Sequence, residues 1–468
     1  MRGPVLVSTI APMSETYRLP DGPKTPQLYN GLAFLLTRNR VIKKWQRRYG
    51  DVFTVRMPGF GQMVLVATPD LVKQVYTAKP DVLHGGKNPL GEILGPGSLF
   101  SMDEEQHLKE RRMLLPPFHG ERMRSYEAII EEEAESAMDS WPEGVEFAAI
   151  GSFQTVTLRI ILRTVFGAEG RELAELQKLL PPMTTIGQRL VTAPFLRRDL
   201  GRRSPGGRWK AMHAEYRRIV DKLVDDHLAD PNLEERIDIL ALMLRGYLAD
   251  AGEINHSDVA DELLTLLVAG HETTASALSW SVERLRRHPE ILRRLEDEAR
   301  TEENALRLAT AEEVLRVRPV INATARLVMK PFAIGEWVMP PGSRVVTGIA
   351  PLHKDARFHE NARNFDPDRY VGKKPDTYAW IPFGGGMRRC IGAAFAQFEI
   401  DIVLRTLLRN FELQTTTEPG ERESFRGVAF APSKGGATVV RRRQLGGPEA
   451  AQSAAEPASA DLITALNS

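Results

Sequence analysis

The chain has 468 residues, of which 42% are hydrophobic and 26% are charged, so it is long enough to bury a large core. Its formal net charge of +1 gives no overall attraction for nucleic acid, and its single cysteine excludes an internal disulfide. Residues 5–10 are apolar but too few to cross a bilayer, so we expect a cytoplasmic protein with no nucleic-acid partner and no transmembrane anchor.

The first hundred residues predict a lead-in, a helix, a hairpin and a loop. Residues 1–27 are polar and proline-rich, which favours an extended lead-in. Residues 52–57 and 63–67 flank a turn containing Pro and Gly and predict a β-hairpin, whereas the Gly-rich residues 80–103 predict a long irregular loop. A helix that ends at Gly50 is predicted by apolar residues at helical spacing: Leu32, Leu35, Leu36, Ile42 and Trp45.

His107 and Arg111 are the first pair with a chemical meaning. They stand at i and i+4 in a helical segment and therefore share one helix face. Two groups able to carry positive charge on one face suit an anionic ligand, although the same pattern also fits a solvated basic surface.

Residues 181–217 are irregular and basic after two scaffold helices within residues 120–180. The segment 197–210 suits a solvated loop between two helices, or a lip over a binding site that contacts acidic substrates or a membrane surface. The sequence leaves both interpretations open. Its basic residues are Arg197, Arg198, Arg202, Arg203, Arg208 and Lys210.

A long helix is predicted over residues 257–288, with Ser257 as N-cap and Pro289 after its end. At ~1.5 Å per residue it would span roughly 48 Å, enough to cross a domain. In its middle, residues 269–274 read Ala-Gly-His-Glu-Thr-Thr. Glycine weakens a helix and threonine can bond back to a carbonyl, so we expect the helix to open locally here, unless the pattern serves only packing.

Glu313 and Arg316 place opposite charges at i and i+3 in a helix that ends before Pro319. Most such pairs lie on the surface and contribute less than about 1 kcal/mol. Short strand patterns follow, separated by Gly or Pro turns, at residues 337–339, 344–347, 428–430 and 437–440. The fold class predicted from these elements is mainly α with minor β.

Residues 383–392 contain the only cysteine, Cys390, together with four glycines that let a flat, bulky partner approach the backbone. Residues 393–408 are strongly apolar and predict a buried helix. The helix start, Arg388 and Arg389 are all expected to lower the pKa of the thiol and so favour a thiolate.

A lone cysteine is more often a small buried hydrophobe, but this setting favours a ligand. Zinc would need about three more nitrogen or sulfur ligands, and no second cysteine exists. A nucleophilic cysteine would need a base from a histidine distant in sequence. A haem iron needs only one protein ligand.

The pattern Phe383-x-x-Gly386-x-Arg388-x-Cys390-x-Gly392 resembles the haem-binding signature of the cytochrome P450 family. The resemblance implies that Cys390 is the iron ligand, that Phe383 packs beside the thiolate, and that Arg388 reaches a haem propionate. It also implies that Gly384 and Gly392 belong to the haem-binding loop.

The other motifs resemble further signatures of the same family. His107, Arg111 and Arg326 match residues that hold the propionates, and Ala269 borders the haem in the distal-helix signature. Glu272 and Thr273 match an acid–alcohol pair that supplies protons to dioxygen, with Thr274 as a further catalytic candidate. The resemblance also implies a buried structural triad of Glu313, Arg316 and Arg369.

The resemblance implies one cytochrome P450 domain over residues 28–443, with a long central distal helix, small β-sheets and a loop at 80–103 that covers the substrate. Residues 444–468 are too poor in large apolar groups to order themselves, so we expect a disordered tail. The domain would use non-covalent haem b, O2 as co-substrate and electrons ultimately from NAD(P)H through a ferredoxin and its reductase. These would oxidise a small lipophilic substrate.

A basic docking face for the ferredoxin would comprise Arg111, Arg112, Arg388, Arg389, Lys373 and Lys374. The alternatives are a peroxide-driven peroxygenase or isomerase, and a non-catalytic haem-thiolate protein that binds a ligand or senses a gas. The presence of both Glu272 and Thr273 argues against the peroxide-driven routes.

Overall fold

The computed structural model describes residues 17–37, 39–86, 89–118 and 120–443. The α-helices are α1 (Gln27–Thr37), α2 (Asn39–Tyr49), α3 (Pro69–Tyr76), α4 (Gly91–Leu94), α5 (Glu104–Leu114), α6 (Glu127–Met138), α7 (Ile150–Thr164), α8 (Gly170–Thr192), α9 (Pro205–Ala229), α10 (Ile239–Ala251), α11 (His256–Leu285), α12 (Pro289–Glu298), α13 (Ala305–Val317), α14 (Ile349–His353) and α15 (Ala393–Asn410). The strands are β1 (Val52–Met57), β2 (Gly61–Val66), β3 (Leu83–His84), β4 (Phe147–Ala148), β5 (Ala323–Val328), β6 (Phe332–Ile334), β7 (Trp337–Met339), β8 (Arg344–Gly348), β9 (Phe411–Leu413), β10 (Glu423–Arg426), β11 (Ala429–Pro432), β12 (Ala437–Thr438) and β13 (Val440–Arg442).

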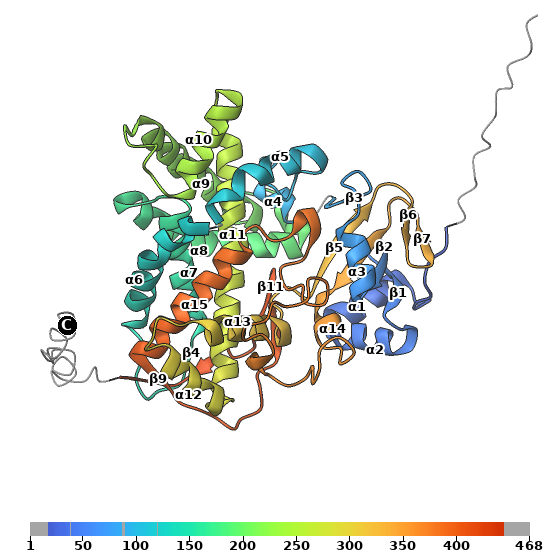
Figure 1. Ribbon diagram of the computed structural model, residues 1–468. Coiled ribbons are helices and arrows are strands. Elements are labelled where there is room, and N and C mark those ends of the chain that lie inside the picture. The colour runs from blue at the N-terminus through green and yellow to red at the C-terminus, as the bar shows by residue number, and fades with distance from the viewer. Residues whose placement is uncertain (1–16, 38, 87–88, 119, 444–468) are drawn as a thin grey trace, which may run out of the picture.

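Helices form the larger part of the molecule, and a five-stranded sheet of order β1-β2-β8-β5-β3 lies to one side with α1, α2 and α3 beside it (Figure 1). The remaining strands form two-stranded ribbons, including the hairpin β10–β11. This architecture confirms the predicted fold class, mainly α with minor β.

The long helix α11 runs through the helical part, and α15 lies next to it (Figure 1). The N-cap of α11 is Asn255, whose side chain accepts a hydrogen bond from the backbone N–H of Ser257. The expectation that Ser257 is the N-cap was therefore wrong by two residues. The helix does not open in its middle. Thr273 Oγ1 donates to the carbonyl of Ala269 at 2.6 Å, which satisfies the hydroxyl without breaking the helix.

The first turns of α11 hold the loop that was predicted over residues 80–103. Asp261 Oδ2 accepts the N–H of Gly97 at 3.0 Å, and Glu262 Oε2 accepts that of Leu99 at 2.7 Å. Burial raises the pKa of Glu262 well above its usual value. The loop is less irregular than predicted, since it contains β3 and α4.

Two further expectations were wrong in detail. The helix predicted to end at Gly50 is described as α1 and α2, on either side of residue 38, and Leu32 and Leu36 are exposed although they were assigned to its apolar face. In the basic region, α8 continues through Pro181 and Pro182, so only residues 193–204 connect α8 to α9.

The chain termini are only partly described. Arg18, within the predicted lead-in of residues 1–27, forms an isolated bridge with Val338 of β7. Residues 1–16 and the predicted disordered tail at 444–468 lie outside the described residues. Within the described part, no helix is both long and apolar enough to span a membrane.

Candidate functional site

Cys390 is held in a turn between the 3-10 helix Gly386–Arg388 and α15. Its N–H donates to the carbonyl of Phe383 at 2.9 Å, and its sulfur accepts the N–H of Gly392. The Phe383 ring packs edge-on against Trp380, with centroids 5.9 Å apart. The loop therefore presents one thiol from a closely hydrogen-bonded backbone.

Cys390 lies at the start of a helix, as expected, two residues before Gly392, the N-cap of α15. Burial raises the pKa of the thiol, and the opposing effects of the Gly392 N–H, Arg111 and Arg389 do not offset it. The expected lowering of the pKa was wrong because burial dominates.

The glycines of the loop serve two purposes. A Cβ on Gly385 would lie 2.1 Å from Tyr76 Cδ2, and one on Gly386 would lie 2.2 Å from the Tyr76 carbonyl oxygen, so both allow α3 to approach. By contrast, a Cβ on Gly392 would meet nothing within 4 Å, and one on Gly384 only Thr324 Cγ2 at 3.7 Å. Only Gly384 and Gly392 thus leave room for a partner outside the chain.

Four nitrogen-bearing side chains that were predicted separately gather near this loop. Burial, with smaller contributions from Arg388 and Arg111, lowers the pKa of His107 to about 4, so the imidazole is neutral at pH 7. Burial also lowers the pKa of Arg326 to about 10, with Arg388 contributing. Within the described part of the chain, neither Arg111 nor Arg326 pairs with a carboxylate, and the one side-chain hydrogen bond of Arg326 goes to the Ala325 carbonyl at 2.8 Å.

Unlike Arg111 and Arg326, Arg388 has a carboxylate partner within the chain. Its guanidinium pairs with Asp103 and donates to the carbonyl of Met102 at 2.6 Å. Asp103 also accepts the N–H of Gly85 at 2.7 Å. The pair therefore joins the cysteine loop to the segment before α5.

The middle of α11 presents a less covered face. Ala269 is exposed although most residues of this helix are buried, and Gly270 and Thr273 are half-buried. Cys390 likewise keeps an exposed surface although it lies deep enough for burial to raise its pKa. Both residues therefore keep surface that the described residues do not cover.

Glu272, one turn from Ala269, is buried, and each of its carboxylate oxygens has one protein donor. Its Oε1 lies 3.1 Å from Nε of Arg426, and its Oε2 accepts from Nε2 of Gln154 at 2.7 Å. The Thr273 hydroxyl makes its hydrogen bonds to the carbonyls of Ala269 and Gly270. No direct bond between Glu272 and the Thr273 hydroxyl is present among the described residues.

The Thr274 side chain contacts α15. It is buried, and its hydroxyl is hydrogen-bonded to Glu399 of α15. We correct the expectation that Thr274 is catalytic, because its hydroxyl joins two helices instead.

Glu399 gives a testable pH dependence. Burial raises its pKa to about 8 from a usual 4.5, and its Oε1 has no partner within the described residues. Between these values the folded chain keeps a proton that the unfolded chain has lost, so stability falls as pH rises from about 4.5 to about 8. Glu399→Gln should flatten this fall by up to ~1.4 kcal/mol per pH unit, measured by urea unfolding at pH 5 to 8. The control Glu302→Gln, at a side chain 93% exposed, should leave the slope as it is; equal slopes for Glu399→Gln and the parent would contradict the assignment.

The predicted triad is present. Glu313 and Arg316 are both fully buried, with Oε1 and Nη2 2.7 Å apart, and Arg369 Nε lies 3.1 Å from Glu313 Oε2. Arg316 also donates to the carbonyls of His353, Ala362 and Asn364 at 2.8 to 2.9 Å. The triad thus ties α13 to the segment that leads toward the cysteine loop.

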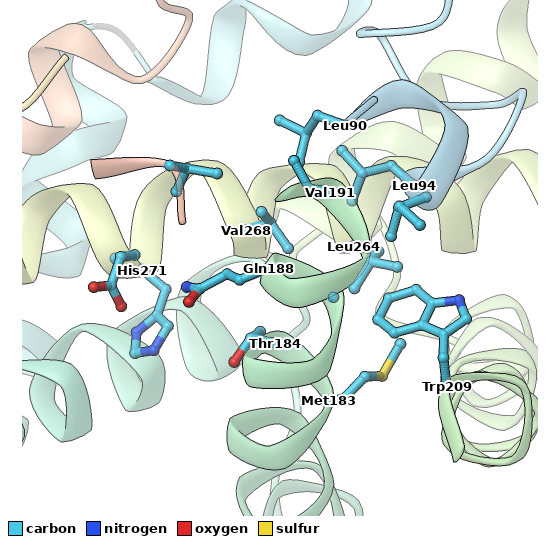
Figure 2. A pocket seen from close by; sticks show the side chains of 14 residues that line it. Leu90, Leu94, Met183, Thr184, Gln188, Val191, Trp209, Leu264, Val268 and His271 are labelled. Carbon is cyan, nitrogen blue, oxygen red and sulfur yellow. The ribbon is translucent and has the colours of Figure 1, made fainter. Parts of the chain in front are cut away.

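A narrow pocket lies between α4, α8 and α11. Figure 2 shows Leu264 and Val268 of α11 facing Met183 and Gln188 of α8, with Trp209 at one side. Its walls are mainly apolar, and Glu272 lines one end. The cavity suits a lipophilic molecule.

Sequence reasoning missed Gln154, Arg426 and Glu399. Gln154 and Arg426 lie 118 and 154 positions from Glu272, and no local spacing links them to it. Glu399 stands in an apolar helical run, where a carboxylate is unusual. The carboxylate in this apolar run was the one sequence feature that could have pointed to Glu399.

Comparison with known proteins gives concordant results. The family model described as "Cytochrome P450" matches residues 20–439. "Putative cytochrome P450 138" of Mycobacterium tuberculosis (strain ATCC 25618 / H37Rv) is 48% identical over 438 residues, covering 93% of this chain and 99% of the relative. "Putative cytochrome P450 135B1" of Mycobacterium bovis is 36% identical over 432 residues, covering 90% and 91%.

Two solved structures share the fold. One, described as "Retinoic acid bound cyanobacterial CYP120A1", superposes with a TM-score of 0.79 at 21% identity, covering 92% of this chain and 100% of that one. The other, "Crystal structure of cytochrome P450DA heme domain", has a TM-score of 0.78 at 22% identity, covering 91% and 98%.

Proposed function

Because the chain belongs to the cytochrome P450 family, we propose that it is a haem-thiolate monooxygenase that inserts one oxygen atom of O2 into a lipophilic organic substrate. The family implies a haem cofactor and oxidoreductase activity. One observation carries the finer proposal. The Cys390 thiol keeps an exposed surface, and nearby Arg111 and Arg326 have no carboxylate partner among the described residues.

The residues present fit haem b. Cys390 would supply the iron ligand, and Gly384 and Gly392 leave space beside it. Arg111, Arg326 and the neutral His107 would hold the two propionates, because neither arginine pairs with a carboxylate in the described part of the chain. Arg388 would bind a propionate only if its guanidinium contacted both the propionate and Asp103, or gave up its ion pair with Asp103. No Cys-x-x-Cys-His motif exists for covalent attachment, since the chain has one cysteine.

When bound, the haem supplies the redox chemistry of dioxygen activation, and a thiolate ligand favours cleavage of the O–O bond. The chain's own contribution is to hold and move protons. Glu272, at the end of the apolar cavity, would take protons from water, and the Thr273 hydroxyl would orient the water that passes them on. Since no hydrogen bond joins the Glu272 carboxylate to the Thr273 hydroxyl among the described residues, at least one water has to connect the two groups.

Electrons would come from NAD(P)H through a ferredoxin and its reductase, which we place in the cytoplasm with this enzyme. Arg112, Arg389, Lys373 and Lys374 are exposed and suit an acidic partner. Arg388 does not belong to this surface, because its side chain is 12% exposed and paired with Asp103. Arg111 is enclosed as well, so it contributes through the site rather than at the surface.

The experiment that tests the function measures NADPH oxidation with a surrogate ferredoxin and reductase. A library of sterols, fatty acids and polyketides is first titrated for a haem spin-state shift, and the compound with the largest shift becomes the probe substrate. A monooxygenase should oxidise NADPH in a substrate-dependent manner and form a product carrying one atom from ¹⁸O2. A protein that only binds ligands or senses a gas should show neither, and a peroxygenase should need added peroxide.

Thr273→Ala should separate NADPH consumption from product formation. The helix should persist, since alanine is the better helix former and the lost hydrogen bond is local. Without the hydroxyl to orient water, reduced dioxygen should leave as hydrogen peroxide, so NADPH oxidation continues while product falls. The control Thr164→Ala removes a similar bond, Oγ1 to the Ile160 carbonyl at 2.7 Å, in α7 and should stay coupled. Full coupling in Thr273→Ala would refute the role of this hydroxyl.

A further inference from the structure

The turn of a β-hairpin brings a cation to the acid of the proposed relay. Arg426 is the last residue of β10 and pairs across the hairpin with Ala429 of β11. Its Nε lies 3.1 Å from Glu272 Oε1, while Gln154 of α7 donates to Oε2 at 2.7 Å. Each oxygen of the carboxylate is thus held by a donor from a different element, and neither donor belongs to α11.

The hairpin itself is firmly attached to α11. The buried Trp280, about two turns after Glu272, donates its indole N–H to the carbonyl of Phe430 at 2.8 Å. At the turn, Gly427 has φ +75, and a Cβ there would lie 2.6 Å from Cγ of Gln188 in α8. The backbone that carries Arg426 therefore packs against both α8 and α11.

The pair spans the boundary between interior and solvent. The Glu272 side chain is 7% exposed and that of Arg426 is 41% exposed. A guanidinium keeps its proton at all ordinary pH values, so Arg426 cannot be the proton donor. A carboxylate accepts about four hydrogen bonds, so two positions on Glu272 remain for water.

We propose that Arg426 is a positioning residue for the proton relay: together with Gln154 it fixes the Glu272 carboxylate so that its free positions face the water that leads to Thr273. The inference rests on the proposed monooxygenase function. A carboxylate without these two donors would rotate among several orientations, and few of them would keep a water in line with Thr273.

Activity measurements test the proposal in three variants. With the probe substrate and surrogate ferredoxin, Arg426→Gln should lower the product formed per NADPH several-fold and change the solvent isotope effect on turnover. Arg426→Lys should restore part of both values, because it keeps the charge. The double variant with Glu272→Gln should be no worse than Glu272→Gln alone. The matched control is Arg422→Gln, an exposed arginine just before β10, which should behave as the parent.

Thermal unfolding gives a readout independent of turnover. Arg426→Gln leaves a buried carboxylate without its cation and should lower Tm, and adding Glu272→Gln should restore part of the loss. If Arg426→Gln forms as much product per NADPH as the parent, the proposal is overturned whatever the Tm of the variant. The proposal is also overturned if the effects of Arg426→Gln and Glu272→Gln simply add in the double variant, both in product per NADPH and in Tm. Should Glu272→Gln alone couple as well as the parent, the proposed relay itself fails, and not only the role of Arg426.

Discussion

Glu313→Ala should abolish haem incorporation, although Glu313 belongs to a structural triad and not to the cysteine loop. The substitution leaves the fully buried Arg316 without its carboxylate and removes the acceptor of the Asp366 N–H. Breaking a buried ion pair by removing one partner costs about 3–5 kcal/mol, which is a large fraction of the stability of a typical domain. The expected product is aggregated or haem-free protein, measured as haem per chain after purification.

The matched control for this variant is Glu290→Ala. Glu290 and Arg293 form the same i,i+3 pair, but both side chains are largely exposed on α12. Such a pair contributes less than about 1 kcal/mol, so the control should load haem as the parent does. A stable, fully loaded Glu313→Ala protein would refute the structural duty of the triad.

Cys390→His should reduce NADPH-driven product formation to background. Imidazole can still bind haem iron, and Arg111 and Arg326 remain to hold the propionates, so part of the haem should be retained. What disappears is the electron donation of a thiolate, on which O–O cleavage depends. Haem content and product per NADPH are measured on the same sample, and product at the parent rate would exclude Cys390 as the ligand.

The residues that a motif holds at constant spacing were predictable from the sequence. Glu313 and Arg316 stand one helical turn apart, so their pairing follows from helix geometry once the helix is recognised. Arg369, more than fifty positions later, joins them in the structure, and the resemblance alone had placed it there. The long helix α11 was likewise predictable to within a few residues, because Pro289 marks its C-terminal boundary, although its N-cap is Asn255 and not Ser257.

Contacts between distant segments were not predictable. Glu272 meets Arg426 because a hairpin turn packs against α8 and α11, and this depends on tertiary packing alone. Gly385 and Gly386 were expected to face a flat ligand but accommodate Tyr76 of α3. The sign of the Cys390 pKa shift also depended on burial, which local charges such as Arg389 do not reveal.

The ferrous–CO spectrum of the purified holoprotein tests the central claim most directly. If Cys390 ligates the iron as a thiolate, the Soret band of the CO complex should show the strong red shift of thiolate ligation, and this band should be absent in Cys390→His. A CO complex of the parent with the unshifted band typical of histidine ligation, or a red-shifted band that survives in Cys390→His, would contradict the account.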